Sequence, residues 1–563
     1  MSRIRPIPWR GLAVATLLIL GHVAAAQTAP QRAAVASAHP LASAAGIEVL
    51  QRGGNAFDAA IAVAAALGVV EPYGSGIGGG GFFLLRRAAD DFEVMIDARE
   101  TAPLAASRDM YLDAAGEPVP GASVDGALSA GIPGLPAGLA YLAEHYGELA
   151  LADSLAPAIR HAREGFPADS EYIARLERRS DVMNAAARET LMPEGALPRE
   201  GDLVLQPELA ATLESLARGG FSGFYEGPVA QKLVAGVRAG GGIWALEDLS
   251  AYEVVERQPL VGHYRSVRVV TAAPPSSGGV ALLNMLNMLA GYDLSALDDA
   301  ARVHLLAEVM RRAHRDRAEF LGDPDFVDVP VERLIHPYYA AGQRISIHPE
   351  RATPSLDLPG FLPSGPAGGD QTSHFSVLDA EGNAVAATQS INFSFGSGYM
   401  PAGTGVLLND EMDDFSVKPG VPNGYQLLGS EANAIAPGKR MLSSMTPTIL
   451  IGDNGMALLG TPGGSRIITM VLLAGLAWMD GADAVSMTAL PRIHHQYFPD
   501  EIYFEGDALD EADVDRLRAM GHSLSEVGRA FGNMQVVTWD FASGTVDAAA
   551  DPRGIGEPRF SAP

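Results

Sequence analysis

The chain has 563 residues, of which 47% are hydrophobic and 19% are charged, and it contains no cysteine. This composition is typical of a folded protein with a full core, and the length allows three or four domains or one large α/β body. The absence of cysteine excludes a disulfide scaffold, a cysteine-ligated metal site and a cysteine nucleophile. A net charge of −27, from 40 Lys and Arg against 67 Asp and Glu, makes nucleic acid a poor partner.

The first 26 residues have the pattern of an export signal. Arg3, Arg5 and Arg10 precede the apolar run 11–26, which ends in three alanines. A basic start, an apolar middle and a small-residue cleavage site predict a signal peptide over 1–26 and a periplasmic or secreted protein. An uncleaved membrane anchor is the alternative, but the apolar run is shorter than the roughly 20 residues of a spanning helix. No later segment is suited to stable membrane insertion.

From Gln27 to about Ile345 the sequence is alanine-rich, with helical periodicity broken by glycine and proline. Residues 49–55 are predicted to end one helix and residues 58–67 to form the next. The run 59–70 is uniformly apolar, which predicts a buried helix.

A glycine-rich stretch, 72–85, is predicted to be a loop that runs into a strand. A phosphate-binding loop is the alternative, but neither Gly-Lys-Ser/Thr nor the G-x-G-x-x-G spacing is present, so close backbone packing is favoured. The short strand predicted over 92–96 places Arg99 just past a strand end, which is a common place for a ligand-binding residue. A surface ion pair is the alternative for this arginine.

A hairpin with hydroxyl side chains at its open end follows a Pro- and Gly-rich stretch, 351–370, that is predicted to be an irregular surface loop or linker. Residues 372–379 and 384–391 are prone to form strands, and the connection between them ends in Gly382, the residue suited to a left-handed turn position. Pairing Asp379 with Asn383 sets Thr372 opposite Ser390, with Asn392 nearby. Opposed Cβ atoms lie about 4.5–5.5 Å apart, so hydroxyl contact is expected, although an ordinary Thr/Ser cross-strand pair has the same geometry.

Several long blocks carry a family resemblance. They read QTSHFSVLDAEGNAVAATQSINFSFGSG, VLLNDEMDDFSVKPGVPN, MLSSMTPT and GTPGGSRIIT in the second part of the chain, and AAGIEVLQRGGNAFDAAIA, SGIGGGGFFLL, IDARETAP and AGIPGLPAGL upstream. Together they resemble the γ-glutamyltranspeptidase family over nearly the whole mature chain.

The resemblance implies an α+β fold of the N-terminal nucleophile hydrolase type, a four-layer αββα sandwich. It also implies a precursor that cuts itself between Gln371 and Thr372 into a large subunit, 27–371, and a small subunit, 372–563, which remain together as one body. Before the cut the nitrogen of Thr372 is an amide. After the cut it is an α-amine with a reference pKa of about 7.7–8, able to take the proton of its own hydroxyl.

Roles for individual residues follow from the same resemblance. The catalytic positions are Thr372 as nucleophile, Ser390 where the family usually has threonine, and Gly463 and Gly464 as the oxyanion hole. The α-carboxylate of the glutamyl group is assigned to Arg99, Ser443 and Ser444. Its α-amine is assigned to Asn392, Asp414 and Glu411, the last at a position where some members have glutamine. Tyr425 matches the tip of a lid loop, with an exposed loop tyrosine as the alternative.

The implied function is hydrolysis and transfer of γ-glutamyl groups from amides such as glutathione, to water or to the amines of amino acids and peptides. No metal or organic cofactor is implied, and His374, His494 and His495 are predicted to be structural. Two alternatives stay open: a glutaryl-type (cephalosporin) acylase of the same fold, and an unprocessed scaffold without catalysis. A serine hydrolase with a catalytic triad is disfavoured because the sequence has no G-x-S-x-G elbow.

Overall fold

The computed structural model describes residues 27–562, apart from 193–194, 361–371 and 530. The predicted signal peptide, the second half of the 351–370 stretch and Gln371 therefore lie outside the described residues. None of the helices in the described part of the chain is both long and apolar enough to cross a membrane.

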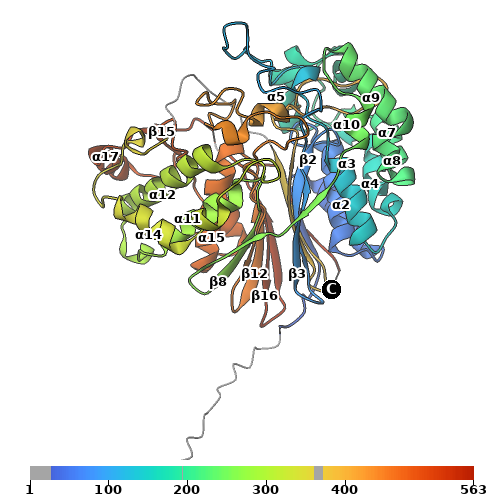
Figure 1. The fold of residues 1–563 in the computed structure, drawn as a ribbon. Coiled ribbons are helices and arrows are strands. Elements are labelled where there is room, and N and C mark those ends of the chain that lie inside the picture. The colour runs from blue at the N-terminus through green and yellow to red at the C-terminus, as the bar shows by residue number, and fades with distance from the viewer. Residues whose placement is uncertain (1–26, 193–194, 361–371, 530, 563) are drawn as a thin grey trace, which may run out of the picture.

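Two antiparallel sheets form the centre of the molecule (Figure 1). The seven-stranded sheet has the order β18 (Arg559–Phe560), β1 (Ala34–Ser37), β9 (Ser373–Leu378), β10 (Ala384–Ser390), β2 (Gly80–Arg87), β3 (Phe92–Ala98) and β6 (Val255–Arg257). The six-stranded sheet has the order β17 (Val546–Ala550), β16 (Gln535–Asp540), β12 (Gly455–Gly460), β11 (Thr448–Ile451), β8 (Val267–Thr271) and β7 (Leu260–Tyr264).

Helices cover the outer face of each sheet (Figure 1). The seven-stranded sheet is covered by α1 (Pro40–Gln51), α2 (Ala56–Val70), α3 (Leu135–His145), α4 (Leu151–Glu164), α7 (Pro207–Gly219), α8 (Ser222–Tyr225), α9 (Gly227–Ala239) and α10 (Leu246–Ser250). The six-stranded sheet is covered by α11 (Gly278–Leu289), α12 (Asp299–Phe320), α13 (Val331–Leu334), α14 (Pro337–Ile345), α15 (Ile467–Met479), α16 (Ala484–Ala489) and α17 (Glu511–Ala519). These layers confirm the predicted αββα sandwich.

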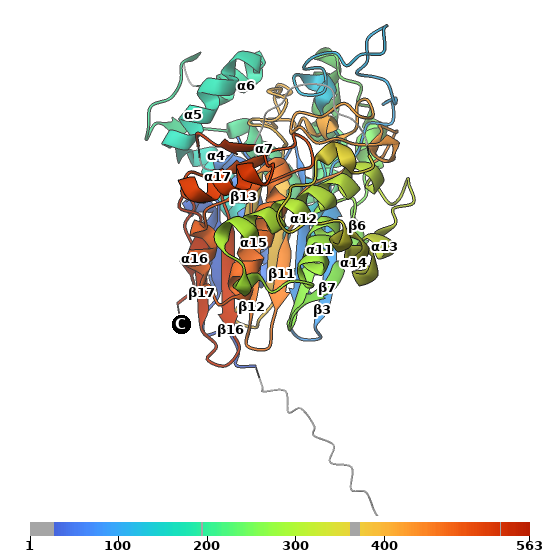
Figure 2. The same ribbon diagram turned by 90° about the vertical axis from the view of Figure 1, so that its left-hand side faces the viewer.

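Smaller elements complete the fold. Helices α5 (Ser170–Arg179) and α6 (Ala185–Leu191) lie together at one end of the sandwich (Figure 2). A three-stranded sheet consists of β13 (Ile493–His494), β14 (Ile502–Phe504) and β15 (Leu524–Glu526), and a two-stranded sheet of β4 (Phe166–Pro167) and β5 (Leu203–Val204).

The period-2 alternation of strand side chains explains how the layers pack. In β2, Phe83 and Leu85 pack against the helices of the outer layer, whereas Phe82 and Leu84 point toward the other sheet. Because both faces are buried, the strand sequence is apolar at successive positions rather than alternating. Helix α2 is buried at every one of its 15 residues, which confirms the buried helix predicted from its uniform apolar sequence.

Each sheet contains strands from before and from after Thr372. In the seven-stranded sheet β9 and β10 lie between β1 and β2, and in the six-stranded sheet β11 lies next to β8. The helical periodicity before residue 345 predicted mainly helix, and strands β1, β7 and β8 were not predicted from the sequence. Strand β1 reads AVAS, which has weak local strand preference, and it is extended because it pairs with β9 and β18.

Candidate active site

The predicted site residues follow or precede strands that meet at one end of the sandwich. Strand β9 begins at this end, and because neighbouring strands are antiparallel, β10 ends there, β2 begins there and β3 ends there. Thr372, Ser390 and Arg99 are therefore brought together from distant parts of the chain. In the other sheet the end of β12 and the start of β11 lie at a common end, which places Gly463 and Gly464 near Ser443 and Ser444.

The hairpin that carries Thr372 has the predicted register. Leu378 pairs with Ala384 and Ser373 with Gln389, so Thr372 comes next in line with Ser390. The Asp379 carboxylate accepts hydrogen bonds from the backbone N–H groups of Ala56, Glu381 and Asn383, at 2.8–3.1 Å. Gly382 adopts φ +88°, the left-handed conformation expected of it. The turn is thus held by a buried side chain as well as by the strand ladder.

The hydroxyl groups of Thr372 and Ser390 face each other with their oxygens 3.4 Å apart, and both residues are buried. Ser390 Oγ also accepts a hydrogen bond of 2.8 Å from the backbone N–H of Asn392. The glycine-rich loop packs directly on this point, because a Cβ atom on Gly79 would lie 2.0 Å from the carbonyl oxygen of Ser390. This confirms close backbone packing as the reason for the glycines.

Gly463 directly precedes, and Gly464 begins, the short 3₁₀ turn Gly464–Arg466 that connects β12 to α15. Their φ values are +135° and +55°, which side-chain-bearing residues rarely adopt. Gly464 has a second reason to be glycine, because a Cβ there would lie 2.3 Å from the ring of Tyr425. Thr372 and Gly464 line one cavity, and Thr372 and Gly463 line a second one.

The first cavity is narrow, with a volume of about 20 Å³. Its lining contains all of the predicted substrate-binding residues and the hydroxyl pair: Arg99, Asn392, Glu411, Asp414, Tyr425, Ser443, Ser444, Thr372 and Ser390. The structure therefore brings together residues that the sequence analysis had assigned to one site. We call this the head-group cavity.

Charged groups dominate one wall of the head-group cavity. The Arg99 guanidinium contacts Glu411 at 2.7 Å and Asp414 at 2.5 Å. Arg99 and Glu411 are each about 1% exposed, so the charges interact with little screening by water. Glu411 and Asp414 are thus not acidic residues on a solvated turn.

Glu411 has capacity left for a further partner. Its Oε2 atom is buried and, among the described residues, has no hydrogen-bond partner. Burial raises the pKa of the Glu411 carboxyl well above its usual value, and the neighbouring carboxylates of Glu100 and Asp414 raise it further against the opposing effect of Arg99. A cation placed beside Oε2 would relieve both effects.

A second buried arginine, Arg317 of α12, was missed by the sequence analysis. Its Nη2 atom lies 3.5 Å from Ser444 Oγ and its Nε atom donates to Ser277 Oγ at 3.1 Å. Burial lowers the pKa of Arg317 to about 10, and the charge of Asp414 opposes that change. A signal was present, because Arg317 lies on the same helical stripe, at i+4 and i+7, as the buried Ala313 and Met310.

Tyr425 lies in the loop between Asp414 and β11 and lines the head-group cavity. Its hydroxyl donates to the carbonyl oxygen of Asn392 at 3.0 Å, and its ring stacks on Phe393 with centroids 4.7 Å apart. Gln496 Nε2 donates to the Tyr425 carbonyl oxygen at 3.1 Å. Tyr425 is only 7% exposed, so the alternative of an exposed loop tyrosine is wrong.

The three histidines that the sequence analysis set aside are buried and hydrogen-bonded. His374 contacts Thr388 Oγ1 at 2.8 Å, and burial lowers its pKa to about 3. His494 contacts Thr469 Oγ1 at 2.9 Å, and His495 lies 3.3 Å from Asp500. None of the three lines either cavity beside Thr372.

One cluster in the described part of the chain has the composition of a metal site. It consists of His304, Glu308 and His522, whose ligand atoms lie within 4.8 Å of one another. However, His304 Nδ1 and His522 Nε2 are hydrogen-bonded to each other at 2.7 Å, and Glu308 is paired with Arg312 at 2.6 Å. The donor atoms therefore satisfy one another, and the arrangement is explained as a polar network within the core.

Known proteins resemble this chain in both sequence and fold. The sequence model of the γ-glutamyltranspeptidase family matches residues 42–560, which is most of the chain. The chain belongs to the γ-glutamyltranspeptidase family. Two similar relatives are the glutathione hydrolase proenzymes of Pseudomonas sp. (strain A14), 43% identical over 91% of both chains, and of Escherichia coli K12, 40% identical over 93% of this chain and 90% of the relative.

Solved structures of the same fold agree with this membership. The γ-glutamyltranspeptidase of Helicobacter pylori is 40% identical with a TM-score of 0.56, covering 57% of this chain and 94% of that chain. The cephalosporin acylase of Bacillus halodurans is 27% identical with a TM-score of 0.82, covering 99% and 98%. The chain is therefore an enzyme of the γ-glutamyltranspeptidase type with the N-terminal nucleophile hydrolase fold, as the sequence analysis predicted.

Proposed function

We propose that this chain is an exported γ-glutamyl hydrolase and transferase that acts on γ-glutamyl amides such as glutathione through Thr372. The observation that carries the proposal is the head-group cavity, which combines the Thr372 hydroxyl with Arg99, Glu411 and Asp414. One cationic residue and two acidic residues that line the same cavity as this hydroxyl suit an amino-acid head group whose side-chain carbonyl is attacked. The glutathione hydrolases among its relatives support the same substrate class.

Thr372 becomes active when the chain is cut between Gln371 and Thr372. The free α-amine then takes the hydroxyl proton as Oγ1 bonds to the γ-carbonyl carbon, and the C–N bond breaks as the proton passes to the leaving amine. Water or an acceptor amine next attacks the ester and releases Thr372. The name proenzyme given to the relatives supports the processing step.

The neighbouring groups assist this chemistry. Ser390 Oγ lies 3.4 Å from Thr372 Oγ1 and keeps the hydroxyl oriented. The backbone N–H groups of Gly463 and Gly464 stabilise the oxyanion of the tetrahedral intermediate, a contribution of about 3–4 kcal/mol per donor in comparable enzymes. Tyr425 covers the acyl group, which limits access of water and favours transfer to amines.

The head group is held at both of its charges. Arg99, with Ser443, Ser444 and the buried Arg317, receives the α-carboxylate. Asn392, Asp414 and the unpartnered Oε2 of Glu411 receive the α-ammonium. Binding of the zwitterion replaces part of the internal pairing between Arg99 and the two carboxylates, so neither charge is left uncompensated.

The cephalosporin acylase alternative is favoured by one observation, the match to the Bacillus halodurans structure over nearly the whole chain. Glutaryl and γ-glutamyl groups differ only by the α-amine, so the carboxylates around that amine distinguish the two functions. Kinetics with γ-glutamyl-4-nitroanilide and glutaryl-4-nitroanilide therefore test the proposal. Thr372→Ala is the control that removes the nucleophile.

We expect the wild-type enzyme to prefer the γ-glutamyl donor and Asp414→Asn to reduce that preference by about 10- to 100-fold, because a hydrogen bond to a charged group contributes about 1.5–3 kcal/mol. Thr372→Ala is expected to cleave neither donor. A wild-type preference for the glutaryl donor, or undiminished cleavage by Thr372→Ala, would overturn the proposed function.

A further inference from the structure

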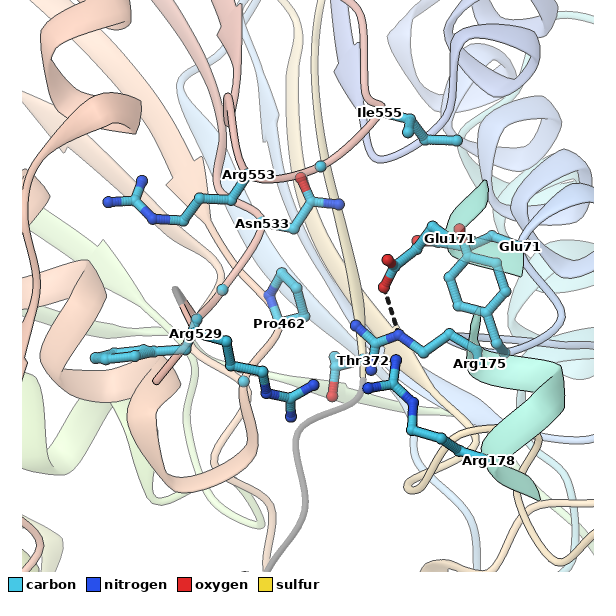
Figure 3. A pocket seen from close by; sticks show the side chains of 15 residues that line it. Glu71, Glu171, Arg175, Arg178, Thr372, Pro462, Arg529, Asn533, Arg553 and Ile555 are labelled. Carbon is cyan, nitrogen blue, oxygen red and sulfur yellow. Dashed lines mark hydrogen bonds and ion pairs between the residues drawn. The ribbon is translucent and has the colours of Figure 1, made fainter. Parts of the chain in front are cut away.

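A second cavity, with a volume of about 370 Å³, adjoins Thr372, which is the one residue that its lining has in common with the head-group cavity. It is lined by Thr372 and Gly463, by Arg175 and Arg178 of α5, by Arg529 after β15, and by Asn533 and Arg553. Figure 3 shows the side chains of Arg175, Arg178 and Arg529 pointing toward Thr372 from two different parts of the chain. We call it the arginine cavity.

The charge of the arginine cavity differs from that of the molecule. The chain carries a net charge of −27, yet four arginines and only two carboxyl residues, Glu71 and Glu171, line this space. Glu171 is paired with Arg175. Burial raises the pKa of Glu71 to about 8, so this carboxyl is mainly uncharged at neutral pH. The cavity is therefore cationic beside the reacting hydroxyl.

Arg178 has the most capacity for an anionic ligand. Its Nε donates to the carbonyl oxygen of Ala174 at 3.1 Å, and within the described part of the chain no carboxylate oxygen lies within 4.0 Å of its guanidinium. Burial, and then the charges of Arg175 and Arg529, lower the pKa of Arg178. Cations that repel one another at one end of a cavity are stabilised when an anion lies between them.

The position of the arginine cavity beside Thr372 indicates which part of a substrate would enter it. The acyl half of a γ-glutamyl amide occupies the head-group cavity, so the C–N bond lies at Thr372 Oγ1. The amine half then leaves the head-group cavity at Thr372, the residue that lines both cavities, and enters the arginine cavity. The same space receives the acceptor, whose nitrogen bonds to the acyl carbon as the Thr372 ester bond breaks and whose proton returns to Oγ1.

We propose that Arg178 and Arg529 determine specificity for the amine half of the donor and for the acceptor: from the arginine cavity they bind a carboxylate on that half, such as the one carried by an amino acid or by a peptide with a free C-terminus. This inference rests on the proposed function and extends it to the second substrate. Arg553 contributes less directly, because it is paired with Glu505 at 2.6 Å and Asp551 at 3.1 Å.

A matched pair of donors tests the inference: γ-glutamyl-4-nitroanilide and γ-glutamyl-3-carboxy-4-nitroanilide. They share the acyl half and differ by one carboxylate on the amine half. The readout is the ratio of their kcat/KM values, because intrinsic differences in leaving-group reactivity cancel when enzymes are compared. The variants are Arg178→Gln/Arg529→Gln and the charge-conserving Arg178→Lys/Arg529→Lys. Arg218→Gln is the matched control, because Arg218 is an exposed arginine on α7 that does not line the cavity.

We expect the double glutamine variant to lower the ratio of carboxylated to plain donor by about tenfold, the effect of losing charge-assisted hydrogen bonds. The lysine variant is expected to keep most of the ratio and Arg218→Gln all of it. High salt is expected to reduce the ratio in the wild-type enzyme and not in the glutamine variant.

An unchanged ratio in the glutamine variant, with the plain donor still hydrolysed, would overturn this inference and leave the proposed function intact. Failure of the wild-type enzyme to hydrolyse either donor would overturn the proposed function itself. Thermal unfolding of each variant separates a lost contact from a misfolded chain.

Discussion

Glu71, a buried carboxyl near Thr372, the proposed nucleophile, was not predicted from the sequence, and its pKa is strongly raised. Its Oε2 accepts a hydrogen bond of 2.5 Å from Ser373 Oγ, one residue after Thr372. Burial raises its pKa from 4.5 to about 8, while the Ser373 hydroxyl acts in the opposite direction. In its neutral form Glu71 keeps negative charge away from the reacting hydroxyl and from the arginine cavity.

The Glu71→Gln variant is expected to change how stability depends on pH. The folded chain holds the Glu71 proton up to about pH 8, whereas the unfolded chain releases it near 4.5. This contribution is complete below pH 4.5 and is lost as the pH rises through 8, so the free energy of unfolding falls across that interval. Glutamine does not titrate, so we expect the fall to be smaller in the variant by up to about 1.4 kcal/mol per pH unit.

Denaturant unfolding between pH 5 and 9 measures this effect. Placing Glu71→Gln in the Thr372→Ala chain separates the stability change from processing. Parallel curves for the two chains across pH 5–8 would show that Glu71 is ionised throughout and would contradict the assignment.

At the residue scale the sequence predicted most of the head-group cavity. The positions of Arg99, Asn392, Glu411 and Asp414 came from the family resemblance, and the structure brings them to one place. Arg317 and Glu71 were not predicted, because each becomes part of the site only through packing of its helix or loop. Sequence spacing gives the face of a helix but not the site toward which that face turns.

At the scale of elements, the loop that carries Tyr425 fits against the turn that carries Gly463 and Gly464. Gly464 leaves room for the Tyr425 ring, which a Cβ would approach to 2.3 Å. We expect Gly464→Ala to lower stability by about 1–3 kcal/mol through this clash, in addition to the cost of a left-handed φ. Gly53→Ala is the matched control, since Gly53 also has a positive φ of +92° but has nothing within 4 Å of its Cβ position.

A double-mutant cycle isolates the clash. Tyr425→Ala combined with Gly464→Ala is expected to recover the steric part of the loss, whereas Tyr425→Ala combined with Gly53→Ala is expected to recover nothing. Thermal unfolding midpoints give the comparison. Additive effects of Tyr425→Ala and Gly464→Ala would show that the loop that carries Tyr425 is not packed on the turn as described.

Elements with strong local signals were predicted well. Helix α2 and the register of β9 with β10 follow from an uninterrupted apolar run and from a glycine turn. Strands β1 and β18 were not predicted, because they are two to four residues long and are extended only through pairing with each other and with β9. Long-range pairing of this kind leaves little trace in a local sequence window.

The whole molecule is one body in which the segments before and after Thr372 are interleaved. Strand β9 is hydrogen-bonded to β1, and strand β10 to β2. The hydrophobic core between the seven-stranded sheet and its helices contains residues from both segments, and so does the core between the two sheets. Separation of the two segments would expose these cores and the unpaired edges of both sheets.

Self-cleavage is therefore expected to leave a single particle. Size-exclusion chromatography of the cut protein should give one peak that contains both products, and a denaturing gel of that peak should give two bands. Elution of the two products as separate species in native buffer would contradict the interleaved arrangement.

The central claim is that Thr372 is the nucleophile and is released by the chain itself. Intact mass and N-terminal sequence of the purified protein, compared with those of Thr372→Ala under the same denaturing conditions, test it most directly. We predict two chains in the wild-type protein, the smaller beginning at Thr372, and one uncut chain in the variant. A single chain in both proteins, or a cut that persists in Thr372→Ala, would contradict the claim.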